Sequence, residues 1–265
     1  MGYIRMKGKV LEYTRSELMA IAAARELKDG EIAFVGIGLP NLAANLAKRM
    51  HAPNLVMVYE AGVVGANPSR LPLSIGDPCL VTGSQSVCTM FEVFSLYLQA
   101  GRIDVGFLGG AQIDKYGNIN STVIGDYEKP KVRLPGSGGG CDIALLAKRI
   151  LIITPHEIRR FPEKVDFVTS PGFLGGKMER QKLKLEGEGP VKVITDLAIL
   201  GFDKETGEMV LESVHPGVSV EDVKKNTGWN LKVSRDLKVT EEPSEKELLT
   251  LRELDPKGIY LGKRG

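Results

Sequence analysis

Short apolar runs alternate with helical patterns along the first two thirds of the chain. The apolar runs 31–35 and 54–59 predict strands, and the apolar spacing over 42–50 predicts a helix between them that Pro40 begins. A strand–helix–strand unit is the basis of a parallel sheet, whose strands are buried on both faces and apolar throughout. The same reasoning predicts strands at 79–82, 103–108, 150–154 and 165–169, and helices at 89–98 and 144–149.

The last third of the chain has a different pattern. Apolar runs at 191–195, 197–202 and 208–212, with a turn at 203–207, predict a hairpin within a mixed sheet. Capping boxes at 14–17 and 244–247 begin an N-terminal and a C-terminal helix, and Ser219 begins a short helix. No linker or internal repeat interrupts the chain. We therefore expect one α/β domain over 1–265: an open, mostly parallel sheet flanked by helices, with a mixed-sheet C-terminal part and terminal helices.

Composition narrows the class of protein. Hydrophobic residues make up 43% and charged residues 26%, as in ordinary globular proteins. With 35 basic and 33 acidic residues the net charge is +2, which gives no reason to expect nucleic acid as a partner. No apolar run reaches the roughly 18–20 residues needed to span a bilayer. Residues 1–9 lack the apolar core of a secretion signal, so we expect a cytoplasmic protein without a membrane partner.

Cysteine and histidine usage argues against a metal site. The three cysteines, Cys79, Cys88 and Cys141, have spacings that fit neither a disulfide framework nor a zinc site. The three histidines share no i, i+4 spacing, and the run that His156 begins lacks the second histidine of a zinc-protease motif. We expect no metal and no permanently bound cofactor.

Glycines gather where predicted strands end, which is where open α/β sheets bind ligands. The segments are 36–40, 60–62, 109–114, 136–140 and 170–176. The first lacks the third glycine of a dinucleotide fingerprint and a clear acidic ribose ligand, and no glycine loop has the lysine of a phosphate-binding P-loop. The pattern favours neither NAD nor ATP.

Two of these segments suit a role in catalysis. Glu60 follows a buried strand and precedes Gly62, an arrangement that suits a nucleophile but also fits a solvated glutamate at a strand end. The loop 136–140 precedes a helical stretch and exposes main-chain N–H groups that suit an oxyanion or a phosphate, although a flexible surface loop has the same composition. The amides and hydroxyls of 116–122 suit the polar end of a substrate or a turn.

Taken in order, these segments resemble the β subunit of the family I coenzyme A transferases over nearly the whole chain. Within the family they resemble above all the β subunit of glutaconate CoA-transferase, and also the second half of the 3-oxoacid CoA-transferases. The segments that carry the resemblance are 38–40, 60–62, 109–118, 125–127, 135–139 and 169–172. The resemblance implies the fold shared by CoA-transferases and NagB/RpiA-like proteins.

The resemblance also implies roles for single residues. Glu60 matches the family's nucleophilic glutamate, but the motif Ser-Glu-Asn-Gly of the 3-oxoacid branch is Tyr-Glu-Ala-Gly here, so a contact from the asparagine is lost at Ala61. The loop that lies against the thioester and helps form the oxyanion site matches Gly136, Ser137, Gly138 and Gly139. Candidate substrate-binding residues are Gly38, Gln112, Asn118 and Asn120.

The activity that the resemblance implies is a CoA-transferase reaction between an acyl-CoA and a short dicarboxylic or 3-oxo acid. It proceeds by ping-pong catalysis through a glutamyl-CoA thioester on Glu60, with coenzyme A as part of the substrate. A separate homologous α subunit completes the enzyme as α2β2 or a larger assembly, and this chain alone is expected to be inactive. Two alternatives stay open: a CoA-thioester hydrolase or decarboxylase on the same scaffold, and a non-catalytic ligand sensor.

Overall fold

The computed structural model describes residues 2–6 and 9–262. The chain divides into two compact units, Met1–Phe107 with Glu241–Gly265 and Leu108–Thr240. Residues 1, 7 and 8, part of the segment 1–9 interpreted as lacking a secretion signal, lie outside the described residues. The expectation of one domain over 1–265 stays a prediction.

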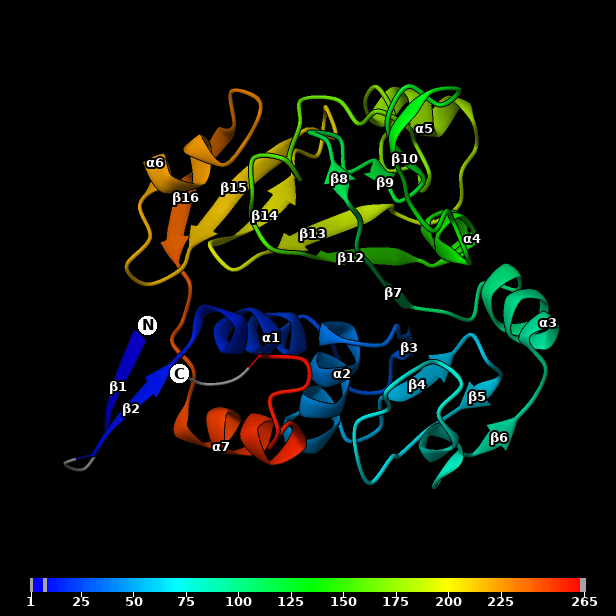
Figure 1. Ribbon diagram of the computed structural model, residues 1–265, viewed down its shortest axis with the longest axis vertical. Helices are drawn as coiled ribbons and strands as arrows, with labels where there is room; N and C mark the ends of the chain where they lie inside the picture. Colours follow the sequence, from blue (N-terminus) through cyan, green and yellow to red (C-terminus); the bar gives the residue numbers. More distant parts are fainter. Residues whose placement is uncertain (1, 7–8, 263–265) are drawn as a thin grey trace. The chain divides into compact units, whose positions relative to one another are not determined.

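The first unit combines the N-terminal part of the chain with the C-terminal helix (Figure 1). Its elements are β1 (Gly2–Met6), β2 (Lys9–Tyr13), α1 (Arg15–Arg25), β3 (Ile32–Phe34), α2 (Leu39–Met50), β4 (Val56–Tyr59), β5 (Val63–Val64), the 3₁₀ helix η1 (Pro78–Val81), β6 (Ser86–Val87), α3 (Met90–Glu92), the π-helix η2 (Val93–Gln99), β7 (Val105–Leu108) and α7 (Glu245–Leu254).

A short parallel sheet organises the first unit. Strand β3 pairs in parallel with β4 and with β7, and β5 and β6 extend the sheet in antiparallel pairs. The side chains of Phe34, Met57 and Val58 are buried, as the apolar runs predicted. The predicted strand–helix–strand unit is therefore confirmed as β3, α2 and β4.

The C-terminal helix belongs to this unit because polar contacts fix it to α1. Thr14 caps α1 by accepting a hydrogen bond from the Glu17 N–H at 3.1 Å, and Glu17 completes the predicted capping box. Glu17 is only 1% exposed, and its carboxylate pairs with Arg252 of α7 at 2.8 Å. A second pair, Arg25 with Glu247, joins the same helices at 2.8 Å. Ser244 caps α7 in the second predicted capping box.

The second unit contains the remaining strands and three short helices (Figure 1). Its elements are β8 (Gln112–Ile113), β9 (Ile119–Asn120), β10 (Val123–Gly125), β11 (Pro130–Arg133), α4 (Gly140–Leu146), β12 (Arg149–Ile153), α5 (Lys177–Lys182), β13 (Pro190–Ile194), β14 (Ala198–Phe202), β15 (Met209–Val214), α6 (Val220–Lys225) and β16 (Lys232–Val239). Strands β12 and β13 are parallel, β13, β14 and β15 are antiparallel, and β15 and β16 are parallel, so the predicted mixed sheet is confirmed.

The predictions of strands at 79–82 and 165–169 are wrong. Residues 79–82 lie largely in η1 because Asp77 accepts a hydrogen bond from the Cys79 N–H at 3.0 Å and Pro78 occupies the first helical position. Residues 165–169 form no strand, because the Asp166 N–H donates to the side chain of Gln112 at 3.0 Å instead of joining a ladder. Ser170, the residue after this segment, forms an isolated bridge to Ile119.

Other differences concern helix boundaries and exposed strands. The predicted helix at 89–98 is present but widens into the π-helix η2, and the helix predicted at 144–149 is α4, which begins four residues earlier. Strands β11 and β16 were not predicted, because most of their side chains are exposed and lack the apolar pattern of a buried strand.

His156 is a buried histidine of the second unit. It is 4% exposed, and its ring stacks on Phe161 with centroids 4.2 Å apart. Its two ring nitrogens lie 3.2 Å and 3.0 Å from the hydroxyls of Thr195 and Thr227. Burial lowers the pKa of His156 to about 4 from 6.5, so the ring is neutral in the folded protein at neutral pH.

We expect His156 to make the stability of the protein fall between pH 6.5 and 4. As the pH drops through this window, His156 binds a proton in the unfolded chain but not in the folded chain, so the free energy of unfolding falls. From pH 8 to pH 5 the wild type should lose about 2 kcal/mol more of its free energy of unfolding than His156→Gln does. Urea unfolding of both proteins at each pH measures the difference, and parallel pH profiles would contradict it.

Candidate active site

Glu60 occupies the first position of a tight hairpin. Tyr59 at the end of β4 pairs with Val63 at the start of β5, so residues 60–62 make the whole connection. Tyr59 is fully buried and its hydroxyl donates to the side chain of Asn41 on α2, which fixes the end of the strand. Burial also raises the pKa of Tyr59, so its hydroxyl stays protonated as a donor. Glu60 thus extends from a rigid strand end.

The carboxylate of Glu60 is partly buried, and within residues 2–6 and 9–262 it has no hydrogen bond or ion pair. A carboxylate with a fixed cationic partner would be weakened as a nucleophile, because that partner would hold its lone pairs. Glu60 carries no such partner inside the described part of its own chain. Its placement fits a group that acts on a ligand better than a group that stabilises the fold.

Gly62 shapes the hairpin that presents Glu60. Its N–H donates to the Tyr59 carbonyl at 3.0 Å, and its own carbonyl accepts from the Cys88 N–H at 2.8 Å. Its φ is +107°, a region that favours glycine. The hairpin therefore depends on a glycine at this position and on strand β6, which ends just before Cys88.

Gly38 lies at the same edge of the sheet as Glu60. Strands β3 and β4 are parallel neighbours, so the turn 36–38 after β3 and the hairpin after β4 leave the sheet on one side. Gly38 precedes α2 with φ +99°, and a Cβ added there would meet no atom within 4 Å. The predicted substrate-binding glycine thus faces open space beside the strand that carries Glu60.

The predicted oxyanion loop, residues 136–139, lies in the second unit at the start of α4. The φ angles of Gly136 and Gly138 are +98° and +49°, and a Cβ at either would meet no atom within 4 Å. Among the residues that the structure describes, the N–H groups of Ser137, Gly138 and Gly139 have no hydrogen-bond partner. Three open amides in sequence form an arrangement that suits an anion.

Gln112 and Asn120 form a polar pair inside the second unit. The Asn120 amide donates to the Gln112 carbonyl oxygen at 2.7 Å and to the Val123 carbonyl at 2.6 Å. The Gln112 amide donates to Asp166 at 3.0 Å. Both side chains are buried and satisfied by this chain. A role for them in substrate binding stays a prediction, and their contacts point to support of the neighbouring turns.

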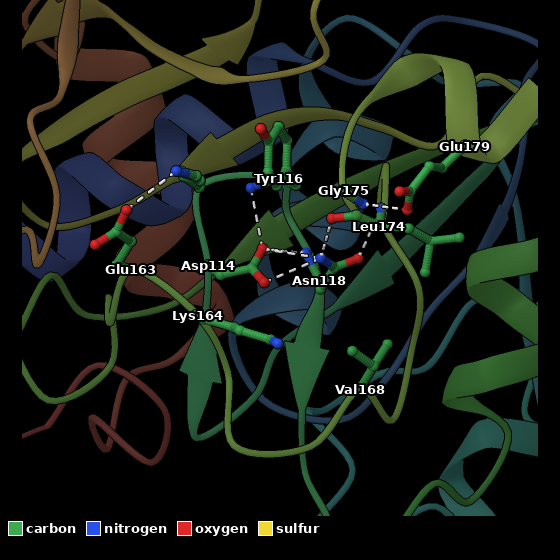
Figure 2. A pocket seen from close by; sticks show the side chains of 10 residues that line it. Asp114, Tyr116, Asn118, Glu163, Lys164, Val168, Leu174, Gly175 and Glu179 are labelled. Atoms are coloured by element: carbon green, nitrogen blue, oxygen red, sulfur yellow. Dashed lines mark hydrogen bonds and ion pairs between the residues drawn. The ribbon is translucent and has the colours of Figure 1, made fainter.

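Asn118 holds a loop in a strained shape (Figure 2). Its amide donates to Asp114 at 3.0 Å and to the Leu174 carbonyl at 2.9 Å, and its carbonyl oxygen accepts from the Leu174 N–H at 3.0 Å. Leu174 has φ +59°, unusual for a non-glycine residue. Asn118 borders a cavity of about 600 Å³, yet its polar atoms are already used. Substrate binding by Asn118 therefore also stays a prediction.

Neighbours of the glycine loop were not identified from the sequence pattern. Thr169 accepts a hydrogen bond from the Ser121 N–H at 2.9 Å and lies 2.7 Å from the Thr122 hydroxyl. Ser121 in turn contacts Gly136. Ser121 and Thr169 are 48 residues apart in sequence, and no local periodicity links them. Two signals were available: the hydroxyls of 116–122 suited the polar end of a substrate, and Thr169 and Gly136 belong to the ordered set of segments that carries the family resemblance.

Three further observations bear on the expected chemistry. Among the described residues no group of three or more His, Cys, Asp or Glu could hold a metal ion. In the same part of the chain, no helix is both long and apolar enough to cross a membrane. Cys79, Cys88 and Cys141 are free thiols, and burial raises the pKa of each.

Comparison with known proteins defines the class. Residues 16–226 match the family model described as coenzyme A transferase, so the chain belongs to the coenzyme A transferase family. It is 51% identical over 243 residues to the B subunit of 3-oxoadipate CoA-transferase from Pseudomonas knackmussii, with 92% of this chain and 94% of that protein covered. It is 41% identical over 258 residues to the B subunit of glutaconate CoA-transferase from Acidaminococcus fermentans, with 94% and 95% covered.

Solved structures agree with this assignment. The crystal structure of glutaconate coenzyme A-transferase from Acidaminococcus fermentans matches with a TM-score of 0.89 at 38% identity, covering 96% of this chain and 99% of that chain. The decarboxylase AibA/AibB matches with a TM-score of 0.82 at 25% identity, covering 95% of this chain and 100% of that chain. The predicted family, fold and CoA-transferase class are confirmed.

Proposed function

We propose that this chain is the β subunit of a CoA-transferase in which Glu60 is the nucleophile. The observation that carries the proposal is the position of Glu60: a partly buried carboxylate without a partner among the described residues, on a tight hairpin at the carboxyl edge of parallel strands. A carboxylate oxygen is itself a nucleophile, so it attacks without a general base and needs only placement. The rigid end of β4 supplies that placement.

The reaction has two covalent stages. A Glu60 oxygen attacks the thioester carbonyl of acyl-CoA, the C–S bond breaks, and an acyl–glutamyl anhydride and CoA thiolate form. The thiolate attacks the glutamyl carbonyl and the anhydride C–O bond breaks. The acyl group departs as its carboxylate, and a glutamyl-CoA thioester remains on Glu60. An incoming carboxylate runs the same steps in reverse. In each step one bond forms and one bond breaks, so the reaction needs no reductant, oxidant or proton from outside.

The glycine loop supplies the oxyanion donors in this proposal. Each attack creates a tetrahedral oxyanion, and a fixed N–H donor is worth about 3–4 kcal/mol to such a transition state. The open N–H groups of Ser137, Gly138 and Gly139 are the donors that support this role. Gly38, next to the strand end that bears Glu60, is proposed to let the substrate approach the main chain.

The relatives support a proposal for the partner and for the substrate class. Each of the two relatives is named as the B subunit of its enzyme, so we propose a homologous α subunit that completes the enzyme as α2β2 or a larger assembly. The acids in their names, 3-oxoadipate and glutaconate, are both short dicarboxylic acids. We propose a short dicarboxylic or 3-oxo acid as acceptor, an acyl-CoA as donor, no permanently bound cofactor, and a cytoplasmic enzyme.

Trapping of the covalent intermediate tests this function. The chain is co-expressed with its α subunit, incubated with 3-oxoadipyl-CoA and treated with hydroxylamine, and the modified residue is located by mass spectrometry. We expect an acyl-CoA-dependent hydroxamate on Glu60 in the complex and no turnover by the chain alone. Brisk turnover by the purified single chain would contradict the two-subunit proposal, and modification of a different residue would contradict the role of Glu60.

A second candidate is hydrolysis or decarboxylation of a CoA thioester, which the similarity to the decarboxylase AibA/AibB favours. A transferase must exclude water from the anhydride and thioester, whereas a hydrolase must admit it. The same incubation separates the two: free acid or carbon dioxide that accumulates without an acceptor acid, and without a modified Glu60, would indicate the second candidate.

A further inference from the structure

Ser121 contacts the predicted oxyanion loop through two hydrogen bonds to one residue. Its hydroxyl donates to the Gly136 carbonyl at 2.8 Å, and its own carbonyl accepts from the Gly136 N–H at 2.8 Å. Ser121 is itself held, because its N–H donates to the hydroxyl of buried Thr169 at 2.9 Å. The first residue of the loop is therefore fixed to a rigid neighbour.

The hydroxyl bond has a directional consequence. In a planar trans peptide the C=O of one residue and the N–H of the next point in opposite directions, and the described residues contain no cis peptide bond. Because Ser121 holds the Gly136 carbonyl, the Ser137 N–H is turned away from Ser121. That N–H is the first of the three open amides of the loop.

The next peptide repeats the arrangement. The Ser137 carbonyl accepts from the Gly140 N–H at 2.9 Å, so the Gly138 N–H is turned away from α4 in the same manner. Two successive carbonyls are thus anchored by this chain, one by a side chain and one by the main chain. Only the first anchor is removed by a point substitution that leaves the loop itself unchanged.

We propose that Ser121 is a positioning residue of the transferase, whose hydroxyl aims the Ser137 N–H at the oxyanion of the substrate. This inference rests on the proposed function of the loop. Ser121 itself does not touch the reacting atoms. It fixes the peptide group between Gly136 and Ser137, whose N–H donates to the oxyanion in this proposal. Without the hydroxyl, the Gly136 carbonyl loses its side-chain anchor, the plane rotates more freely, and the donor is present but less well aligned when the oxyanion forms.

The test measures acylation of Glu60 in a single turnover with 3-oxoadipyl-CoA, using the α–β complex. We expect Ser121→Ala to slow this step on the order of 10–100-fold, because a misaligned donor loses part of the 10²–10³-fold that a lost donor costs. KM for the acyl-CoA and the thermal midpoint should stay near those of the wild type. Ser121→Thr, which keeps the hydroxyl, should restore the rate.

A matched control and a double variant make the result specific. Ser95→Ala removes another serine hydroxyl that donates to a main-chain carbonyl, at 2.7 Å from Phe91, and should leave the rate unchanged. Ser137→Pro removes the N–H that Ser121 is inferred to aim, and with it the Ser137 hydroxyl that accepts from the Cys141 N–H at 3.1 Å. In that background Ser121→Ala should have no further effect, because the N–H that the Ser121 hydroxyl is inferred to position is already absent.

The outcomes separate the inference from the proposed function. A wild-type rate for Ser121→Ala together with a slow Ser137→Pro overturns the positioning role and leaves the loop in its proposed role. A wild-type rate for a folded Ser137→Pro overturns both statements about the loop. If Ser121→Ala is unstable on thermal unfolding, Ser121→Cys, which keeps the shape of the side chain with a somewhat larger atom that donates weakly, takes its place under the same criteria.

Discussion

We expect Glu60→Gln to lower turnover of the assembled transferase by at least ~10³-fold, because an amide cannot form the anhydride or the thioester of the proposed mechanism. The residual rate then comes from binding and from the oxyanion donors alone. The change keeps the size of the side chain, and Glu60 has no partner in the described part of the chain that the substitution would strand. Its thermal midpoint should therefore match the wild type, which separates lost chemistry from lost folding.

Two companion variants sharpen this measurement. Glu253→Gln makes the same chemical change at an exposed glutamate of α7 and should retain full activity. Glu60→Asp keeps the carboxylate but draws it back by one methylene, and a misplacement on the order of 1 Å costs about 10²-fold. Steady-state rates and acyl-CoA-dependent labelling of each complex are compared. A Glu60→Gln complex that keeps more than a tenth of the wild-type rate would remove Glu60 from the nucleophile's role.

The sequence predicted those parts of the candidate site that local pattern controls. The apolar run before Glu60 predicted β4, and the glycine after it predicted a turn; both are present as a strand and a three-residue hairpin. The glycine run 136–139 predicted a loop before a helix, and α4 begins at Gly140. In each case the information lies within a few residues, where steric preference and periodicity act.

Long-range contacts account for what the sequence pattern did not predict. Gln112 and Asn120 lie next to glycine turns, which made them candidates for substrate binding, but Gln112 bonds Asp166, a residue 54 positions away. The same contact removes the Asp166 N–H from any ladder and so eliminates the strand predicted there. Asn118 likewise bonds Leu174, 56 positions away. Periodicity carries no record of partners at such separations, so polar groups used by the fold and polar groups free for a ligand look alike.

Gly62→Ala should destabilise the hairpin by about 2–5 kcal/mol and lower activity on the order of 10²-fold. A Cβ at this position would lie 1.8 Å from the Cys88 carbonyl oxygen, a main-chain atom that no rotamer change can move. The positive φ costs about 1–2 kcal/mol for an L-residue, and overpacking against main chain costs about 1–3 kcal/mol more. Relief requires the hairpin to shift, and Glu60, two residues earlier, shifts with it.

Two glycines of the same unit provide controls that separate the cost of the positive φ from the cost of the steric clash. Gly101 has φ +70° but an added Cβ would meet no atom within 4 Å, so Gly101→Ala carries the backbone cost alone. Gly76 has neither a positive φ nor a close neighbour, so Gly76→Ala should be nearly neutral in stability and activity. Thermal unfolding and turnover of the three variants should therefore rank Gly76→Ala, Gly101→Ala and Gly62→Ala in order of increasing damage.

The pattern of activity among these variants tests how Glu60 is presented. If the hairpin fixes the carboxylate, Gly62→Ala loses activity beyond its loss of stability, while Gly101→Ala loses stability only. Labelling of Glu60 by acyl-CoA should fall in parallel with turnover, because a displaced carboxylate attacks the thioester slowly even in folded protein. A Gly62→Ala complex that is destabilised yet labels Glu60 at the wild-type rate would show that the nucleophile needs no fixed hairpin, and that the close approach of Cys88 serves the fold alone.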